Sequence, residues 1–122
     1  MCYQRRRFTI SYSDHPVEYY SKLPTECNVD ECIILDPVID TGSTADAAIS
    51  IVKSWCKNAD GFGKSDKKVK FITVCASKAG LDKLRHSHPD VEYYTAAIDE
   101  TLSSNGSIEP GIGDCGNRLF GP

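Results

Sequence analysis

Small hydroxyl residues and two acids follow a short apolar segment in the first half of the chain. The segment Ile33-Ile34-Leu35 continues as Asp36-Pro37-Val38-Ile39-Asp40-Thr41-Gly42-Ser43-Thr44. A strand that leads through such a turn into a helix presents backbone N–H groups at the positive end of the helix dipole. Gly42 allows close backbone approach, and the hydroxyls of Thr41 and Ser43 add donors. The spacing therefore predicts a phosphate-binding turn at residues 40–44, called the phosphate turn below.

Asp36 stands at the carboxyl end of the expected strand. Open α/β sheets bind ligands at that edge, so the carboxylate could accept hydrogen bonds from a ribose diol. The apolar run at residues 33–35 suits a parallel strand that is covered on both faces. The alternative is a plain strand-turn-helix in which Thr41 or Ser43 serves only as an N-cap, and the turn alone does not decide between the two.

A second segment that could contact a ligand is rich in glycine and lies near the C-terminus. It reads Gly106-Ser107-Ile108-Glu109-Pro110-Gly111-Ile112-Gly113-Asp114-Cys115-Gly116 and is called the glycine-rich loop below. Its glycines let the backbone approach a flat ring, whose carbonyl and N–H groups could pair with backbone amides and carbonyls. The alternative is an ordinary terminal loop of Gly and Pro turns.

Together, in this order, the two segments resemble the uracil phosphoribosyltransferases. The first resembles the phosphoribosyl pyrophosphate (PRPP) motif of type I phosphoribosyltransferases, with Pro37 in place of the usual second acid, as in the uracil branch. The stretches at residues 17–24, 88–91 and 94–99, and the C-terminal run as far as Gly121, are also similar to the family. The resemblance covers residues 16–122 as the phosphoribosyltransferase domain, the C-terminal part of a family member, and leaves residues 1–15 as a short segment without a match.

The resemblance implies an α/β, parallel-sheet, Rossmann-like fold of phosphoribosyltransferase type I, truncated at its N-terminus. It also implies a glycosyltransferase of pyrimidine salvage that transfers ribose 5-phosphate from PRPP to uracil, giving UMP and pyrophosphate. By the resemblance, Asp36 and Asp114 are catalytic. The residues implied to bind PRPP are Asp36, Pro37, Val38, Ile39, Asp40, Thr41, Gly42, Ser43, Thr44 and Asp114. Uracil would be bound by Ile108, Gly113, Asp114 and Cys115, largely through main chain.

The resemblance further implies that Mg²⁺ arrives on the pyrophosphate of PRPP, so no metal site made by the protein is predicted. It makes GTP a candidate activator and predicts a homo-oligomer or pairing with a full-length relative. A formal net charge of −3 gives no reason to expect nucleic acid or a membrane as partner. The basic cluster at residues 5–7 is interpreted as a solvated tail, with a nucleic-acid or localisation signal as the weaker alternative. A cytoplasmic location is predicted.

Arginines that the family uses at the PRPP diphosphate have no match in this sequence. Family members carry an N-terminal region with a pyrophosphate-binding loop and an Arg-Ala-Gly segment, and their Tyr-Arg-Asp stretch is replaced here by residues 11–15. Losing one transition-state donor typically costs about 3 kcal/mol. Three hypotheses stay open: an enzyme completed by a partner or an upstream segment, an inactive nucleotide-binding module, and a non-catalytic interaction subunit. Missing strands would also expose a sheet edge, which favours self-association.

Hydrophobic periodicity predicts the elements that must position these segments. Strands are expected at residues 8–12, 31–35, 68–76 and 91–98, helices at 44–57 and 79–86, and a loop at 58–66. The first helix has an apolar face of Ala45, Ala48, Ile49, Val52, Trp55 and Cys56. Alternation of strand and helix predicts one domain with a parallel sheet and right-handed crossovers.

The remaining reactive side chains carry weaker signals. The six cysteines, Cys2, Cys27, Cys32, Cys56, Cys75 and Cys115, form no Cys-x-x-Cys pair and are predicted to be reduced thiols. Cys115 occupies a position where the family usually has a small or apolar residue beside the base. His15, His86 and His88 are predicted to lie on the surface. Asp99 and Glu100 are either functional carboxylates or solvated loop acids.

Overall fold

The computed structural model describes residues 23–25, 27, 29–59, 67–104, 106–113 and 115–121. Several sequence predictions concern residues outside this part of the chain. They are the strand at residues 8–12, the basic cluster at 5–7, most of the loop at 58–66, Cys2, His15 and Asp114.

Strands and helices alternate along the described chain, as the periodicity predicts. The elements are β1 (Glu31–Leu35), β2 (Val38–Ile39), α1 (Ser43–Ala59), β3 (Lys68–Ser77), α2 (Lys78–Ser87), β4 (Glu92–Asp99), β5 (Thr101–Leu102), β6 (Ile108–Glu109) and α3 (Cys115–Phe120). Helix α1 includes Asn58, which the sequence placed in a loop, and β4 begins one residue later than predicted. Glycine at residue 61 is the first strong helix breaker after α1, so the helix continues beyond its apolar face.

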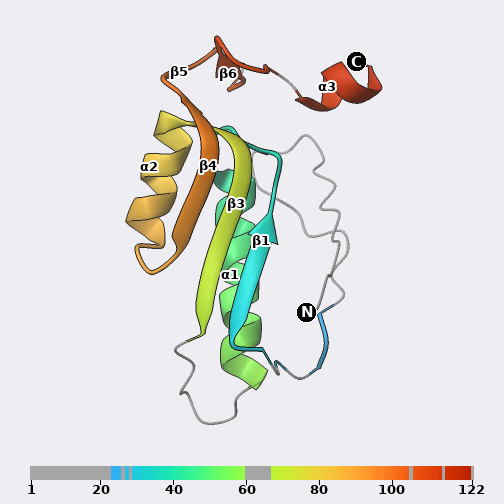
Figure 1. The fold of residues 1–122 in the computed structure, drawn as a ribbon, viewed down its shortest axis with the longest axis vertical. Coiled ribbons are helices and arrows are strands. Elements are labelled where there is room, and N and C mark those ends of the chain that lie inside the picture. The colour runs from blue at the N-terminus through green and yellow to red at the C-terminus, as the bar shows by residue number, and fades with distance from the viewer. Residues whose placement is uncertain are drawn as a thin grey trace.

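Strand β3 is the centre of a parallel sheet, and this arrangement confirms the predicted fold class (Figure 1). Strand β4 pairs with one edge of β3, while β1 and then β2 pair with its other edge. The pairing along that edge is interrupted between β1 and β2. There the carbonyl of Pro37 accepts from the backbone N–H of both Val74 (3.1 Å) and Cys75 (3.3 Å). This interruption sets the chain's direction as it enters the phosphate turn.

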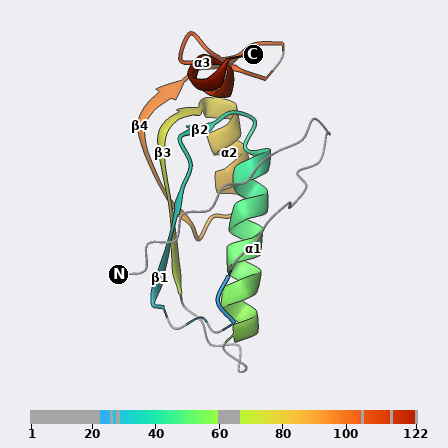
Figure 2. The same cartoon turned by 90° about the vertical axis from the view of Figure 1, so that its right-hand side faces the viewer.

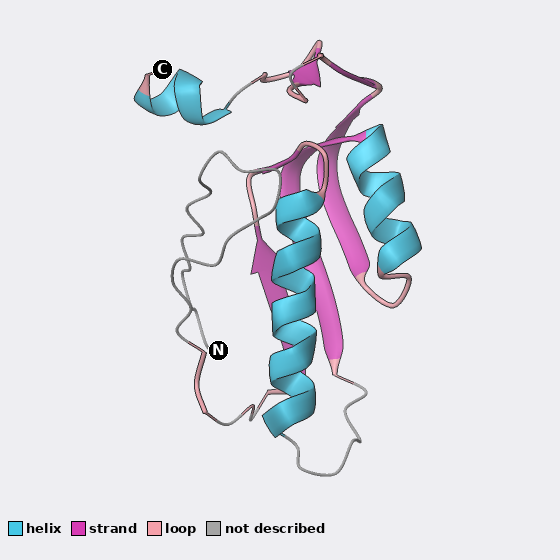
Figure 3. Ribbon diagram, turned by 180° about the vertical axis from the view of Figure 1, so that it is seen from behind, coloured by secondary structure: helices cyan, strands magenta, loops and turns pink. Residues whose placement is uncertain are grey.

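Helices α1 and α2 both lie against the same face of the sheet (Figure 3). The core between them is made by Ile39, Ala45, Ile49, Val69, Phe71, Ala76, Leu84 and Val91. The apolar face predicted for α1 is confirmed, since Ala45, Ala48, Ile49 and Cys56 are buried and Val52 packs on the core. These contacts fix the N-terminus of α1 relative to the sheet.

The opposite face of the sheet is not covered by any described element (Figures 1 and 2). The prediction that residues 33–35 form a strand covered on both faces is therefore wrong for this structure. Side chains alternate along a strand, so Cys32 and Ile34 face the helices while Ile33 and Leu35 face the other side. Ile33 and Leu35 are 54% and 61% exposed.

The C-terminal elements lie beyond the carboxyl ends of β3 and β4 (Figure 1). Strands β5 and β6 form a two-stranded antiparallel pair, and α3 follows. The same end of the sheet also carries the N-terminus of α1 (Figure 2). No helix in the described part of the chain is long and apolar enough to cross a membrane.

Candidate functional site

Asp36 leaves the end of β1 at the sheet edge where the other candidate residues gather. Its backbone N–H donates to the carbonyl of Ile72 at 3.2 Å, which extends the ladder by one residue. Burial raises the pKa of the Asp36 carboxyl to about 6, against a hydrogen bond from the Val38 backbone that lowers it. The charge of Asp40 raises the pKa further. The charged form of Asp36 is therefore less stable than that of an aspartate on the surface. Hydroxyl donors or a cation next to the carboxylate would stabilise it.

The phosphate turn connects β2 to the first residue of α1. Gly42 has φ of +80°, a backbone conformation that glycine adopts at low cost, and its carbonyl accepts from Asp46 N at 2.9 Å. Thr41 Oγ1 lies 3.3 Å from Ser43 Oγ, to which it donates. Because α1 begins at Ser43, its first N–H groups have no intrahelical acceptor and lie at this turn.

Helix α2 fixes the position of the phosphate turn through backbone contact. Ser77 caps α2 by accepting from Gly80 N at 2.9 Å, and the same hydroxyl donates to the carbonyl of Asp40. A Cβ on Gly42 would lie 2.9 Å from Gly80 O and 3.3 Å from Leu84 Cγ. A Cβ on Gly80 would overlap the carbonyl of Asp40. The two glycines therefore allow an approach that no other residue pair would permit.

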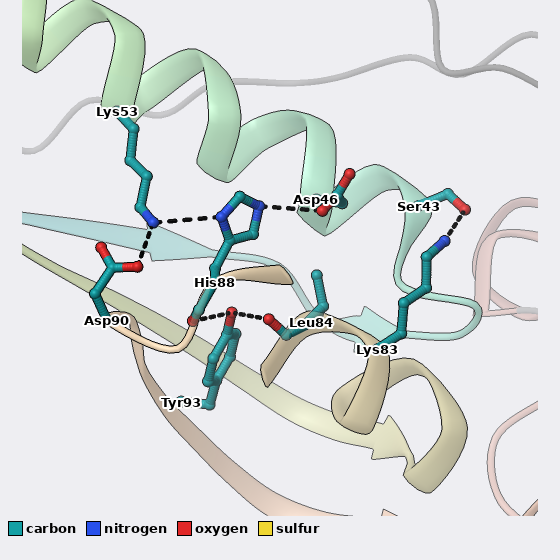
Figure 4. Close-up of polar contacts among 8 residues, drawn as sticks. All are labelled: Ser43, Asp46, Lys53, Lys83, Leu84, His88, Asp90 and Tyr93. Carbon is teal, nitrogen blue, oxygen red and sulfur yellow. Dashed lines mark hydrogen bonds and ion pairs between the residues drawn. The ribbon is translucent and has the colours of Figure 1, made fainter. Parts of the chain in front are cut away.

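Lys83, an exposed residue of α2, brings a positive charge to the phosphate turn. Its Nζ donates to Ser43 Oγ at 3.2 Å (Figure 4). No sequence pattern pointed to Lys83, because 40 positions separate it from Ser43 and the two residues share no motif. The only signal available was its place on α2, once α2 is known to contact the turn.

A polar network ties α1 to the end of α2 (Figure 4). His88 Nε2 lies 3.0 Å from Asp46 Oδ1, and Lys53 Nζ lies 3.3 Å from His88 Nδ1 and 2.6 Å from Asp90 Oδ1. The prediction that His88 is a surface residue is wrong, since its side chain is only 13% exposed. The residue sits where the turn after α2 folds back onto α1, while His86 is exposed as predicted.

The glycine-rich loop begins next to the phosphate turn. A Cβ on Gly106 would lie 3.4 Å from Thr41 Cγ2, which is ordinary contact distance. Ile108 is fully buried and stands opposite Leu102 in the β5–β6 pair. Its carbonyl accepts from Gly113 N at 3.2 Å, and Gly113 has φ of +66°. Two of the residues predicted to bind uracil, Ile108 and Gly113, are thus brought together within this loop.

Cys115 and Asp99 both lie close enough to Cys75 to affect its thiol. Burial raises the pKa of the neighbouring Cys75 thiol, and the charges of Asp99 and Asp40 and the interaction with Cys115 raise it further. Arg118 of α3 lies beside the loop, because a Cβ on Gly113 would be 3.8 Å from Arg118 Nε. Arg118 is a second cation that no sequence pattern pointed to, although it stands in a segment that resembles the family. Asp114 lies outside the described residues.

All five described cysteines are free. Cys27 and Cys32 each place Sγ near Sγ of Cys56, at 3.6 Å and 3.7 Å, near the C-terminal end of α1. Burial raises the pKa of Cys56 to about 12. Within the described residues, no group of three or more His, Cys, Asp or Glu side chains could hold a metal ion.

Comparison with known proteins gives the same family in sequence and a like fold in structure. The family described as uracil phosphoribosyltransferase matches residues 4–122. A uracil phosphoribosyltransferase of Dictyoglomus thermophilum is 48% identical over 106 residues, which are 87% of this chain and 47% of the relative. One of Roseiflexus sp. (strain RS-1) is 45% identical over 114 residues, 90% of this chain and 50% of the relative.

Among solved structures, the AQ2163 protein from Aquifex aeolicus has a similar fold. The TM-score is 0.66 at 31% sequence identity, over 84% of this chain and 45% of that protein. The chain spans about half the length of the curated relatives that it matches.

Proposed function

Since this chain belongs to the uracil phosphoribosyltransferase family, we propose that it binds PRPP and uracil and takes part in their conversion to UMP and pyrophosphate. The observation that carries the proposal is the adjacency of the phosphate turn and the glycine-rich loop, with Gly106 packed near Thr41. A nucleoside monophosphate has its phosphate and its base at opposite ends of one ribose. The two segments offer one site of each kind at one edge of the sheet.

The phosphate turn holds the 5-phosphate in this proposal. Backbone N–H groups at the start of α1 and the hydroxyls of Thr41 and Ser43 donate to phosphate oxygens. Lys83, already within hydrogen-bond distance of Ser43, adds a positive charge that an incoming dianion attracts. Because α2 fixes the turn before the ligand arrives, little conformational entropy is lost on binding.

Asp36 holds the ribose hydroxyls, and residues 36–44 together form the PRPP-binding segment. The raised pKa of Asp36 supports this role, because hydrogen bonds from a diol stabilise the carboxylate that burial destabilises. The acids present, Asp36 and Asp40, also fit an Mg²⁺ ion carried by PRPP, which needs few protein oxygens. When bound, Mg²⁺ neutralises charge on the pyrophosphate.

The glycine-rich loop binds uracil in this proposal, through Ile108, Gly113, Asp114 and Cys115. Support comes from the hydrogen bond between Gly113 N and Ile108 O, which brings two of these residues together within the loop. Asp114 also reaches PRPP and is catalytic together with Asp36. As pyrophosphate leaves C1 of the ribose, positive charge grows on the ring, so positioning and nearby carboxylates supply most of the rate.

The first test is UMP formation from uracil and PRPP with Mg²⁺ by the purified, folded chain, followed by titration with UMP. We expect saturable UMP binding. Turnover by the chain alone would mean that the cations for the leaving pyrophosphate are supplied within it or across an oligomer. UMP binding without turnover would support the second candidate, a nucleotide-binding module, and a folded chain that binds neither UMP nor PRPP would contradict both.

A substitution within the glycine-rich loop separates catalysis from folding. Asp114→Asn keeps the size of the side chain and removes its charge, so turnover should fall about 100-fold, the effect of losing one transition-state interaction. The midpoint of thermal unfolding should change little. Unchanged turnover would remove Asp114 from the site.

Three finer parts of the proposal concern partners and location. Activation by GTP is tested by adding GTP to the turnover assay, and self-association by sedimentation. A cytoplasmic location is supported by the free thiols of the described cysteines, which a reducing compartment maintains.

A further inference from the structure

Three cysteine side chains meet where β1 packs on the C-terminal half of α1. Cys27 Sγ donates to Cys56 Sγ at 3.6 Å, and Cys32 Sγ lies 3.7 Å from the same sulfur. We call this group the thiol cluster. Cys56 is its centre, because its sulfur contacts both of the others. None of the three residues belongs to the phosphate turn or to the glycine-rich loop.

The three thiols differ in their access to solvent. Cys27 and Cys56 are each 4% exposed, whereas Cys32 is only partly buried. A dissolved reagent therefore reaches the sulfur of Cys32 first. Cys56 lies behind it, in contact, and is placed to react with whatever Cys32 has bound.

The electrostatics of the thiol cluster assign the same roles. Burial raises the pKa of the Cys32 thiol, but a hydrogen bond with Cys56 and the charge of Lys67 both lower it. The Lys67 ammonium is held in place, because it donates to the carbonyl of Cys27 at 2.6 Å. Burial raises the pKa of Cys56 to about 12, and its two thiol neighbours raise it further. Since the thiolate is the nucleophile in disulfide exchange, Cys32 is the better attacking group of the two.

We propose that the thiol cluster is a site of oxidation by a low-molecular-weight disulfide of the glutathione type, and that the product is a bridge between Cys32 and Cys56. The Cys32 thiolate attacks one sulfur of the small disulfide, whose S–S bond breaks and releases one small thiol. Cys56 then attacks the Cys32 sulfur of this mixed disulfide and expels the second small thiol. The protein loses two electrons and two protons, and the small disulfide gains them as two thiols.

The bridge would connect two elements that are already packed together. Disulfide sulfurs lie about 2.05 Å apart, so the Cys32 and Cys56 sulfurs must approach from contact distance by rotation of their side chains. The two residues are 24 positions apart, and the ring that they close contains Asp36 and the phosphate turn. Cys56 stands about 20 Å along α1 from Ser43, so the bridge forms far from the turn itself. Because it restricts the unfolded chain, the bridge should stabilise the fold.

The experiment incubates the reduced full chain with oxidised glutathione and maps the products by mass spectrometry. Trypsin releases Cys56 in residues 54–57, and Cys27 together with Cys32 in residues 23–53. Cys27→Ser therefore makes the linkage unique. We expect the two peptides to be joined both in the parent and in Cys27→Ser. The midpoint of thermal unfolding should rise by about 5–10 °C and return on addition of dithiothreitol.

A second substitution traps the intermediate. In Cys27→Ser/Cys56→Ser the second attack is impossible, so residues 23–53 should keep one glutathionyl group on Cys32 and the midpoint should not rise. Cys27→Ser/Cys75→Ser is the matched control, since Cys75 is partly buried like Cys32 but lies on β3, outside the thiol cluster. This control should form the bridge as Cys27→Ser does. Circular dichroism checks that each variant folds, and alanine replaces serine at a buried position where serine prevents folding.

The outcomes separate the proposal from its competitors. A folded Cys27→Ser variant without the linked peptides overturns the inference. A linkage in the parent that Cys27→Ser abolishes assigns the bridge to Cys27 and Cys56, and also overturns it. A linkage that leaves the midpoint unchanged overturns the stabilising role of the bridge. Neither UMP nor PRPP enters these measurements, so their result and the test of the proposed function are independent.

Discussion

The phosphate turn and the glycine-rich loop lie side by side at one edge of the sheet but are held in different ways. The turn follows the buried residue Ile39, touches α2 through Gly42 and Gly80, and accepts a hydrogen bond from buried Ser77. The described part of the loop buries one large side chain, Ile108. Its regular backbone pairing is limited to β5 and β6, which have two residues each.

This difference separates stability from ligand recognition. Contacts that hold the turn are also contacts of the core, so a change there should affect folding and phosphate binding together. Contacts that hold the loop are few and local, and such segments open without global unfolding. The chain is thus expected to present a rigid phosphate end and a base end that is ordered more weakly.

The largest effect is expected for Gly42→Ala. The added methyl group would meet Gly80 O at 2.9 Å, and the φ of +80° is strained for alanine, so unfolding should require about 3 kcal/mol less free energy. UMP affinity should fall at least about 30-fold, because the backbone donors of the turn move. Denaturant unfolding and UMP titration measure the two effects.

Gly121→Ala is the control for backbone strain. Gly121 also has positive φ, +83°, but a Cβ added there would meet nothing within 4 Å. This variant should lose only about 1 kcal/mol of unfolding free energy and keep the UMP affinity of the parent. If the two variants were equally stable, the contact between the turn and α2 would contribute nothing.

Asp36→Asn should remove a pH dependence from stability. The carboxyl pKa is raised by burial from 3.8 to about 6, so the folded state holds its proton more tightly than the unfolded chain. The resulting stabilisation is complete below pH 4 and is lost as the pH rises through 6, about 3 kcal/mol in all. The asparagine variant should lack this decline and be more stable than the parent at pH 7, while binding UMP about tenfold more weakly.

Unfolding free energies measured from pH 4 to pH 8 on both proteins test this. Asp90, whose pKa is lowered by its bond from Lys53, adds a contribution of opposite sign that is lost as the pH falls. It is common to both proteins and cancels in their difference. If the unfolding free energies of the two proteins changed with pH in parallel, folding would not shift the pKa of Asp36, and burial would not destabilise its carboxylate.

Lys83→Ala should weaken UMP binding about fivefold at low salt and less at high salt, because an exposed charge near a phosphate is screened. Its contact with Ser43 is exposed, so stability should change little. Lys57→Ala is the control, since Lys57 is an exposed cation in the last turn of α1, at the opposite end from Ser43. Equal losses for both variants would indicate attraction by net charge and no local contact.

The sequence predicted those parts of the molecule that depend on local pattern. The apolar face of α1, the strand at Glu31–Leu35 and the turn at Gly42 each follow from residues near one another in the chain. The contact of Gly80 with the turn and the charge of Lys83 required the packing of α2, which no local pattern reports. His88 was assigned to the surface because its partners, Asp46 and Lys53, lie more than 30 positions away.

The exposed face of the sheet, opposite the two helices, shows a different limit of sequence pattern. Ile33 and Leu35 are apolar whether a partner covers them or not, so the pattern describes the surface that a strand is suited to bury. It does not say which polypeptide buries that surface. The exposure of Ile33 and Leu35 in the structure was needed to separate these statements.

Gly111→Ala gives the smallest expected effect and the sharpest contrast with Gly42→Ala. Its Cβ would overlap Asp99 Oδ2 and lie 3.0 Å from Ile108 Cγ2, but the Asp99 side chain can rotate away, and no positive φ adds strain. Stability should change by less than about 0.5 kcal/mol, since the loop is outside the core, while uracil affinity falls about threefold.

Hydrogen exchange measures the difference between the loop and the turn in the parent protein. The Gly113 amide, bonded to Ile108, should exchange by local opening, and the Asp46 amide, bonded to Gly42, only with global unfolding. Equal protection of the two amides would mean that the loop and the turn unfold as one unit, and the two glycine variants should then differ only by the strain at Gly42.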